Sequence, residues 1–174
     1  MGFKDIAMFN DSLLAKQAWR LLKHLDSLLH KVFKVHFFPN CTFMEAKHSS
    51  GGSHAWNSIL HGRDVLLMGC RWRIGNGKVV SIWQDHWLLR KNMPQVLSPT
   101  VETLAGAKVE ILIKEDARLW DYNLINGMFT PEEADLIKSM PLSRCEAEDT
   151  LFWPFTSNLI YISKSGYRFL KSKE

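Results

Sequence analysis

The dipeptide Asn76-Gly77 separates two short runs of residues in the segment CRWRIGNGKVVSIWQDHW, residues 70–87. A two-residue type I′ turn needs a positive φ at both central positions, and Asn followed by Gly tolerates this best. The segment therefore predicts a Trp-rich β-hairpin over about residues 70–83.

Pairing outward from this turn decides which side chains share a face, because successive residues of a strand point to opposite sides of the sheet. The predicted core face contains Cys70, Trp72, Ile74, Val79, Ser81 and Trp83. The other face contains Arg71, Arg73, Val80 and Ile82. We accordingly assign structural roles to Trp72, Asn76, Gly77, Trp83 and Trp87.

Apolar residues recur at helical spacing on both sides of the predicted hairpin. Before it they predict helices over residues 10–23, 27–38 and 53–68, with N-caps at Asn10 or Asp11, Asp26 and Ser53. In the third of these helices the side chains expected to face inward are Trp56, Ile59, Leu60 and Leu67. After the hairpin, further helix starts are predicted at Asp121, Thr130-Pro131 and Ser163.

The segment from Leu151 to Ile162 is broken by Thr156-Ser157-Asn158 and predicts a second hairpin. Residues 109–113 fit a short strand or the start of a helix equally well. The sequence thus predicts an α+β fold with N-terminal helices, the Trp-rich hairpin and a smaller helix-hairpin-helix part.

Charge is distributed unevenly along the chain. Residues 1–92 contain 13 Lys and Arg against 6 Asp and Glu, residues 93–150 contain 5 against 11, and residues 151–174 contain 4 against 1. Residues 93–108 contain Pro94 and Pro99 and show little periodicity, so we expect a linker there between a basic region, 1–92, and an acidic region, 109–174. The plainer interpretation is that opposite charges neutralise each other within one fold.

Basic residues interleaved with aromatic residues are the feature that points to a partner. Phosphate groups attract Lys and Arg, and exposed aromatic rings stack on bases. The candidate contacts with nucleic acid are Lys16, Arg20, Lys23, Lys31, Lys34, Arg71, Arg73 and Lys78. The alternative is that these cations cover solvated faces while the Trp residues fill the core.

Motifs of catalysis and cofactor binding are missing from the sequence. A phosphate-binding loop needs Gly where Trp72 stands, and the dinucleotide fingerprint needs Gly where Val80 stands. There is no Gly-x-Ser-x-Gly and no Asp-Asp dipeptide. His54 and His61 are two helical turns apart, too far to share one zinc ion. We therefore expect neither an enzyme nor a cofactor or metal site.

The cysteines and the termini bear on the compartment. Cys41, Cys70 and Cys145 are far apart and form no CxxC pair, which favours reduced thiols. Lys4, Asp5 and Asp11 interrupt the N-terminus, and no apolar run is long enough for a membrane span. The sequence therefore predicts an intracellular chain without a membrane partner, and it leaves the compartment open.

The chain contains five specific segments in a fixed order: GFKDIAMFNDSLLAKQAWRLL (2–22), LDSLLHKVFKVHFFPN (25–40), SHAWNSILHGRDVLLMGCRWRIGNGKVVSIWQDHWL (53–88), TPEEADLIKSMPLS (130–143) and EDTLFWPFTSNLIYISKSGYRFL (148–170). This order resembles the region downstream of the polymerase core in plant non-LTR (LINE-type) retrotransposon polyproteins. The resemblance implies an upstream reverse transcriptase domain, of the RNA-directed DNA polymerase family. It also implies a zinc-binding segment, of which this chain holds only the first helix, and often a ribonuclease H domain.

The resemblance carries over no catalytic residue, because the polymerase Asp-Asp motif and the ribonuclease H carboxylates are not in this chain. It implies instead a fragment that contacts RNA or DNA, or that connects to a polymerase segment of the parent polyprotein. The alternative is a structural or relic reading frame with no function of its own. Leu159 stands where the resemblance implies a small or Gly-type residue, which weakens the second hairpin.

Overall fold

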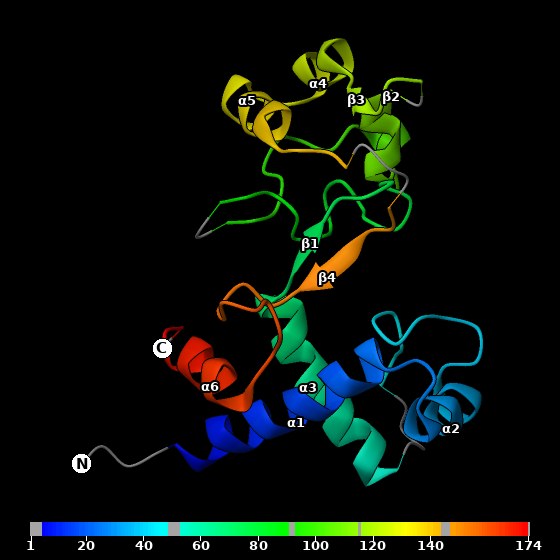
Figure 1. Ribbon diagram of the computed structural model, residues 1–174, viewed down its shortest axis with the longest axis vertical. Helices are drawn as coiled ribbons and strands as arrows, with labels where there is room; N and C mark the ends of the chain where they lie inside the picture. Colours follow the sequence, from blue (N-terminus) through cyan, green and yellow to red (C-terminus); the bar gives the residue numbers. More distant parts are fainter. Residues whose placement is uncertain (1–4, 49–52, 91–92, 115, 144–146, 174) are drawn as a thin grey trace. The chain divides into compact units, whose positions relative to one another are not determined.

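The computed structural model describes residues 5–48, 53–90, 93–114, 116–143 and 147–173. By internal contacts the chain forms two compact units: unit 1 comprises Met1–Cys70 and Trp153–Glu174, and unit 2 comprises Arg71–Phe152. The α+β class is confirmed, since the described residues form α-helices and short antiparallel sheets (Figure 1). The division differs from the expected linker at 93–108, which lies inside unit 2 because Val96 is buried in its core.

Unit 1 contains the helices α1 (Ile6–Lys23), α2 (Leu28–Phe37), α3 (His54–Gly69) and α6 (Ser163–Lys171). Ser53 caps α3 as predicted, by accepting a hydrogen bond from the backbone N–H of Trp56. Two predicted caps are wrong: α1 begins earlier and is capped by Asp5, and α2 is capped by Ser27. In each case the carboxylate or hydroxyl that reaches a first-turn N–H decides where the helix starts.

Trp56 is the centre of an aromatic cluster in unit 1. Its ring stacks on Phe37 and Phe38, with centroid distances of 4.8 and 5.6 Å. Trp56, Ile59 and Leu60 are buried as predicted. Leu67, predicted to face inward, is 43% exposed and its neighbour Leu66 is buried instead. The prediction missed this because the register of the buried face depends on what α3 packs against.

The backbones of α1 and α3 approach each other closely at Gly62. A Cβ at this position would lie 2.3 Å from the backbone carbon of Leu14. Real side chains never approach so closely, so only Gly lets the two helices pack at this distance. The packing places Ala15 and Ala18 of α1 fully out of solvent.

The predicted second hairpin is wrong. Residues from Trp153 to Ile162 form turns, in which the N–H of Trp153 donates to the carbonyl of Leu159 at 3.0 Å and the N–H of Leu159 donates to the carbonyl of Thr156 at 3.2 Å. Leu159 has φ +60°, a left-handed conformation that favours Gly, which explains why a Gly-type residue suits this position. The turns carry Trp153 and Tyr161 into the core, where their rings meet edge to face at 4.7 Å.

The predicted Trp-rich hairpin is also wrong. In unit 2, β1 (Arg71–Arg73) pairs antiparallel with β4 (Thr150–Phe152), with Trp72 opposite Leu151. Asp149 explains the choice of partner. Its carboxylate accepts hydrogen bonds from the N–H groups of Gly75, Gly77 and Val79, at 2.7, 2.9 and 3.0 Å. Residues 74–79 therefore wrap around a carboxylate from a distant part of the chain.

The turn residues act differently from a type I′ hairpin. Gly77 has φ +75°, whereas Asn76 is not among the described residues with positive φ. The Asn76 side chain instead accepts from the N–H of Lys78 at 3.1 Å. A Cβ on Gly77 would lie 2.4 Å from the backbone nitrogen of Glu110, so this Gly is needed for close approach as well as for its φ.

The remaining elements of unit 2 are short: η1 (Glu102–Leu104), η2 (Val109–Leu112), β2 (Ile113–Lys114), β3 (Leu119–Trp120), α4 (Tyr122–Met128) and α5 (Pro131–Ser139). Asp121 caps α4 and Pro131 opens α5, as predicted. Residues 109–113 are mainly a 3-10 turn. The core around these elements contains Trp83, Trp87 and Trp120, and Trp72 packs against it.

Candidate nucleic-acid interface

The outward face of α1 carries the first group of predicted contacts. Lys16, Arg20 and Lys23 follow one another at intervals of four and three residues, which places them on one side of the helix. Arg20 and Lys23 are exposed, and Lys16 is half-buried and donates a 3.0 Å hydrogen bond to the carbonyl of Tyr161. Partial burial lowers the pKa of Lys23, whose ammonium lies 5.1 Å from the ring centre of Trp19.

A second basic face, on α6, was missed by the sequence analysis. Lys164, Arg168 and Lys171 recur at i, i+4 and i+7, while Ser165, Gly166 and Phe169 are buried. All three cations are exposed, and none of them forms an ion pair with a described residue. The spacing was visible in SKSGYRFLK, so the periodicity of charge as well as of apolar residues could have found it.

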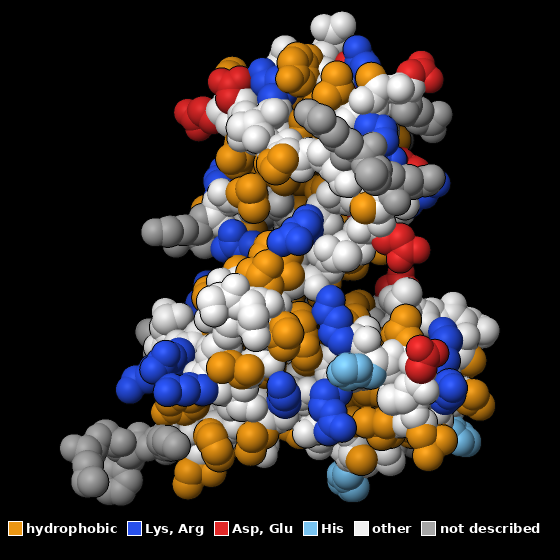
Figure 2. Space-filling model, in the orientation of Figure 1, with side chains coloured by type: hydrophobic (Ala, Val, Ile, Leu, Met, Phe, Trp, Pro, Cys, Tyr) orange, Lys and Arg blue, Asp and Glu red, His pale blue; other side chains and the backbone are white. Residues whose placement is uncertain are grey.

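The structure brings these two basic faces together in one unit. α6 packs on α1, and Tyr161, which precedes α6, donates a 3.0 Å hydrogen bond to the carbonyl of Ser12. Unit 1 contains twelve Lys and Arg against six Asp and Glu, whereas unit 2 contains ten against twelve. Figure 2 shows several blue cationic side chains, and few red acidic ones, on the visible face of the unit that contains α1 and α6.

The lysines of α2 also lie in unit 1. Lys31 is exposed. Lys34 is half-buried, donates a 2.6 Å hydrogen bond to the carbonyl of Cys41, and lies 5.3 Å from the ring centre of Phe38. Lys31 therefore presents its charge to solvent, whereas Lys34 also holds the segment that follows its own helix.

The other three predicted contacts lie in unit 2. Arg71 is half-buried and donates a hydrogen bond to the carbonyl of Arg90. Arg73 is exposed, with its guanidinium 5.5 Å from the ring centre of Phe152. Lys78 is exposed beside the loop around Asp149. These three residues belong to unit 2, the more acidic unit, whereas α1, α2 and α6 belong to unit 1.

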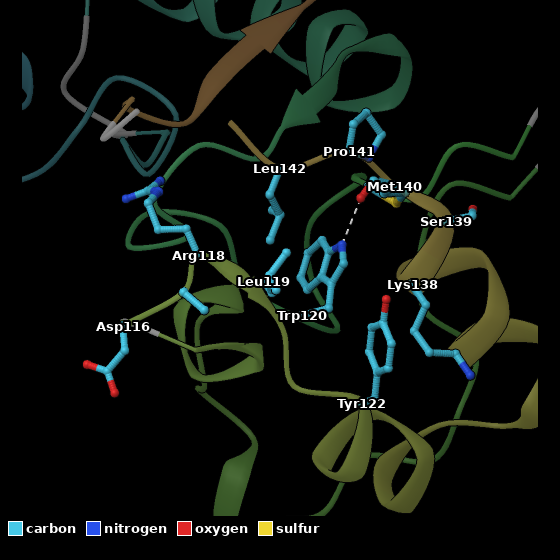
Figure 3. Close-up of a pocket in the computed structure, with 11 residues that line it drawn as sticks. Asp116, Arg118, Leu119, Trp120, Tyr122, Lys138, Ser139, Met140, Pro141 and Leu142 are labelled. Carbon is cyan, nitrogen blue, oxygen red and sulfur yellow. Dashed lines mark hydrogen bonds between the residues drawn. The ribbon is translucent and has the colours of Figure 1, made fainter. Parts of the chain in front are cut away.

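A half-open pocket in unit 2 is lined by residues 116–120, 122 and 138–142, with a volume of about 580 Å³ (Figure 3). The indole of Trp120 donates to the carbonyl of Met140 at 2.8 Å. Lys138 pairs with Asp135 at 2.8 Å and bonds Asn126 at 3.0 Å. Arg118 donates to the carbonyls of Ser143 and Gly75. Two of the three charged side chains that line the pocket, Arg118 and Lys138, are thus bonded to neighbouring parts of the fold.

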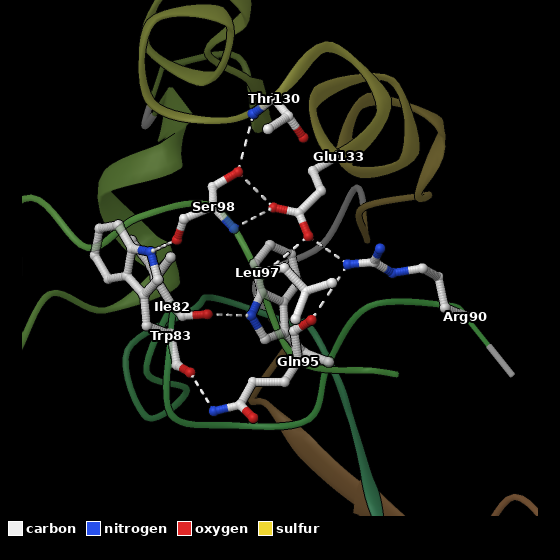
Figure 4. Close-up of polar contacts among 9 residues, drawn as sticks. Ile82, Trp83, Arg90, Gln95, Leu97, Ser98, Thr130 and Glu133 are labelled. Carbon is white, nitrogen blue, oxygen red and sulfur yellow. Dashed lines mark hydrogen bonds and ion pairs between the residues drawn. The ribbon is translucent and has the colours of Figure 1, made fainter. Parts of the chain in front are cut away.

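Glu133 of α5 is a buried carboxylate that accepts four hydrogen bonds (Figure 4). It accepts from the N–H groups of Leu97 and Ser98 at 2.9 and 3.0 Å, from the Ser98 hydroxyl at 2.6 Å, and from Arg90. Burial alone would raise the pKa of Glu133, but these four donors outweigh burial and hold it below the ordinary value. Ser98 is itself buried, so this network positions the 95–98 segment and exposes no nucleophile.

Among the described residues, no group of three or more His, Cys, Asp or Glu could hold a metal ion. Cys41 and Cys70 are free cysteines in the structure, and Cys145 lies outside the described residues. Burial raises the pKa of the Cys70 thiol, which makes it unreactive. None of the described helices is both long and apolar enough to cross a membrane.

Comparison with known proteins finds two similar chains from Arabidopsis thaliana. An "Uncharacterized mitochondrial protein" is 37% identical over 89 residues, which cover 51% of this chain and 58% of that protein. A "Putative ribonuclease H protein" is 27% identical over an alignment of 180 residues, which covers all of this chain and 29% of that protein. No protein-family model and no solved structure matches. The chain therefore corresponds to only part of each relative.

Proposed function

We propose that this chain is a non-catalytic part of a plant retroelement protein and contacts the phosphate backbone of RNA or DNA through unit 1. Similarity to a protein named as a ribonuclease H supports an origin beside nucleic-acid enzymes. The resemblance of five segments to LINE-type polyproteins supports the retroelement origin and a neighbouring polymerase segment as a partner.

One observation carries the proposal: the basic faces of α1 and α6 lie in a unit with twice as many Lys and Arg as Asp and Glu. Because the cations of α6 lack ion-pair partners among the described residues, their charge is available to a phosphate chain. Two exposed cations of unit 2, Arg73 and Lys78, would add weaker contacts.

The test is salt-dependent binding of a short fluorescent RNA and a DNA duplex to the full chain, between about 50 and about 200 mM salt. The variant Arg168→Gln/Lys171→Gln removes two cations of α6. The matched control Lys114→Gln/Lys138→Gln removes two cations of unit 2 that are not candidate contacts. For duplex DNA we expect the α6 variant to reduce the slope of log affinity against log salt by about 2, and the control to reduce it by less than about 1.

The outcomes separate the two functions considered. If the chain melts cooperatively but binds no nucleic acid at low salt, the proposed contact is wrong and a structural or relic role is supported. Equal losses in the α6 variant and in the unit 2 control would mean that net charge alone attracts nucleic acid and that the basic faces of unit 1 are not an interface.

A further inference from the structure

Helix α2 has two apolar faces, and only one of them is used by the fold. Phe33 and Phe37 lie 5.7 and 4.8 Å from the ring of Trp56, and the His30 ring is hydrogen-bonded to the carbonyl of Leu21 at 2.8 Å. These three residues form the inner face. No residue of α2 is buried, although six of its ten residues are apolar.

The outer face of α2 is an apolar stripe of Leu28, Val32 and Val35, extended by Leu25 in the preceding turn. At about 100° per residue these helical positions lie opposite Phe33 and Phe37. Leu28 is 78% exposed and Val35 is 70% exposed. The intervals of four and three residues are those of a seam that receives the side chains of a second helix. A contiguous exposed apolar face of this kind marks an interaction site.

Charge beside the stripe indicates the partner. Within α2 there are two Lys and two His and no Asp or Glu, and Lys31 lies on the flank of the stripe. We propose that this stripe docks an amphipathic helix of a partner protein that carries Leu or Ile at its seam and Glu or Asp on its flanks. This inference does not depend on the proposed function.

The same observations disfavour other occupants. A second copy of this chain would bring like charges together beside the seam, because the helix has no acidic residue to pair with Lys31. A lipid surface favours helices that direct aromatic rings outward, whereas Phe33 and Phe37 point to Trp56. Phosphates of nucleic acid do not cover Leu and Val side chains.

The experiment uses the full chain and a synthetic helical peptide of about three heptads with Leu and Ile at the seam and Glu on the flanks; its twin carries Lys in place of Glu. We expect the Glu peptide to bind, and Leu28→Ser/Val35→Ser to weaken it at least about tenfold. Lys31→Glu should weaken the Glu peptide about two- to fivefold and strengthen the Lys twin. Leu119→Ser, at an exposed leucine of unit 2, should change neither.

Every outcome bears on the proposal. Failure of the Glu peptide to bind at low salt, or equal binding of both peptides, overturns it. A dimer in sedimentation that Leu28→Ser/Val35→Ser dissociates would assign the stripe to a second copy instead. Binding to anionic vesicles that the same variant abolishes would assign it to a membrane. Unchanged helical circular dichroism and thermal melting show that each variant is folded.

Discussion

The two units of the molecule are stabilised by different means. In unit 1, long helices pack through aromatic rings and through one close approach at Gly62, and Trp56 and Trp153 are the largest fully buried side chains there. In unit 2 the regular elements are short. Carboxylates and indoles there bond directly to the backbone of segments 15 or more residues away in the sequence.

The difference has a thermodynamic consequence. Apolar packing responds mainly to lost volume and depends little on pH, whereas a buried carboxylate that satisfies several donors is sensitive to any change of its charge. Unit 1 should therefore be weakened most by shortening an aromatic side chain, and unit 2 by neutralising Glu133 or removing Asp149.

The largest effect is expected for Trp56→Ala. Removing the ring on which Phe37 and Phe38 stack should cost about 3–5 kcal/mol of unfolding free energy. Urea unfolding measures the loss, and hydrogen exchange of backbone amides locates it in unit 1. The control Leu67→Ala, on the same helix but exposed, should stay within about 0.5 kcal/mol. A large effect of the control would mean that α3 is rotated from the described packing.

Glu133→Gln tests the polar side of the comparison. In the variant, an amide N–H₂ group faces N–H and O–H donors that the carboxylate of Glu133 accepts in the native chain, and Arg90 loses its counter-charge. We therefore expect the free energy of unfolding to fall by about 2–3 kcal/mol. Glu132→Gln is the matched control, since Glu132 is exposed and adjacent on α5, and it should be almost neutral. If the two variants unfold alike, the network does not stabilise unit 2.

Acid should destabilise unit 2 more than unit 1. Because the pKa of folded Glu133 lies below the ordinary value of 4.5, the unfolded chain binds this proton first as the pH falls. The stabilisation from Glu133 is therefore fully present above the ordinary pKa and is lost as the pH falls from there through the folded pKa. Amide exchange should accelerate in unit 2 over this range, and Glu133→Gln should remove that part of the dependence. Unchanged pH dependence in the variant would assign the acid sensitivity elsewhere.

The smallest effects are expected at two residues in the left-handed conformation, one in each unit. Leu159→Gly in unit 1 should relieve φ +60° and raise stability by less than about 1 kcal/mol. Arg118→Gly in unit 2 relieves φ +48° but removes bonds to the carbonyls of Ser143 and Gly75, so we expect a loss of about 1–2 kcal/mol. Opposite signs in thermal melting support the comparison, and equal signs contradict it.

Local signals predicted most of the helix starts. Ser53, Asp121 and Thr130-Pro131 act within one turn of the helices that they begin, so the sequence around each of them was sufficient. The basic spacing on α1 was predicted in the same way. The basic face of α6 was equally visible, and the sequence analysis missed it because it followed the apolar residues of that helix alone.

Long-range partners could not be predicted. Asn76-Gly77 indicated a local hairpin. Three N–H groups of that loop instead bond to Asp149, which is 70 or more residues away in the sequence. Glu133 lies in the first turn of α5, and it is also buried against Ser98, 35 residues earlier in the sequence. The residues around Gly77 and around Glu133 in the sequence give no signal that predicts these distant partners.

The sequence by itself determined where most of the helices lie, the helix starts at Ser53, Asp121 and Pro131, and the basic spacing of α1, because each depends on neighbours within about one or two turns. Only the tertiary structure decided the strand pairing, the register of the buried face of α3 and the grouping of α1 with α6. Those features depend on which distant donor, acceptor or ring satisfies a buried group, and buried groups must be satisfied wherever in the chain the partner lies.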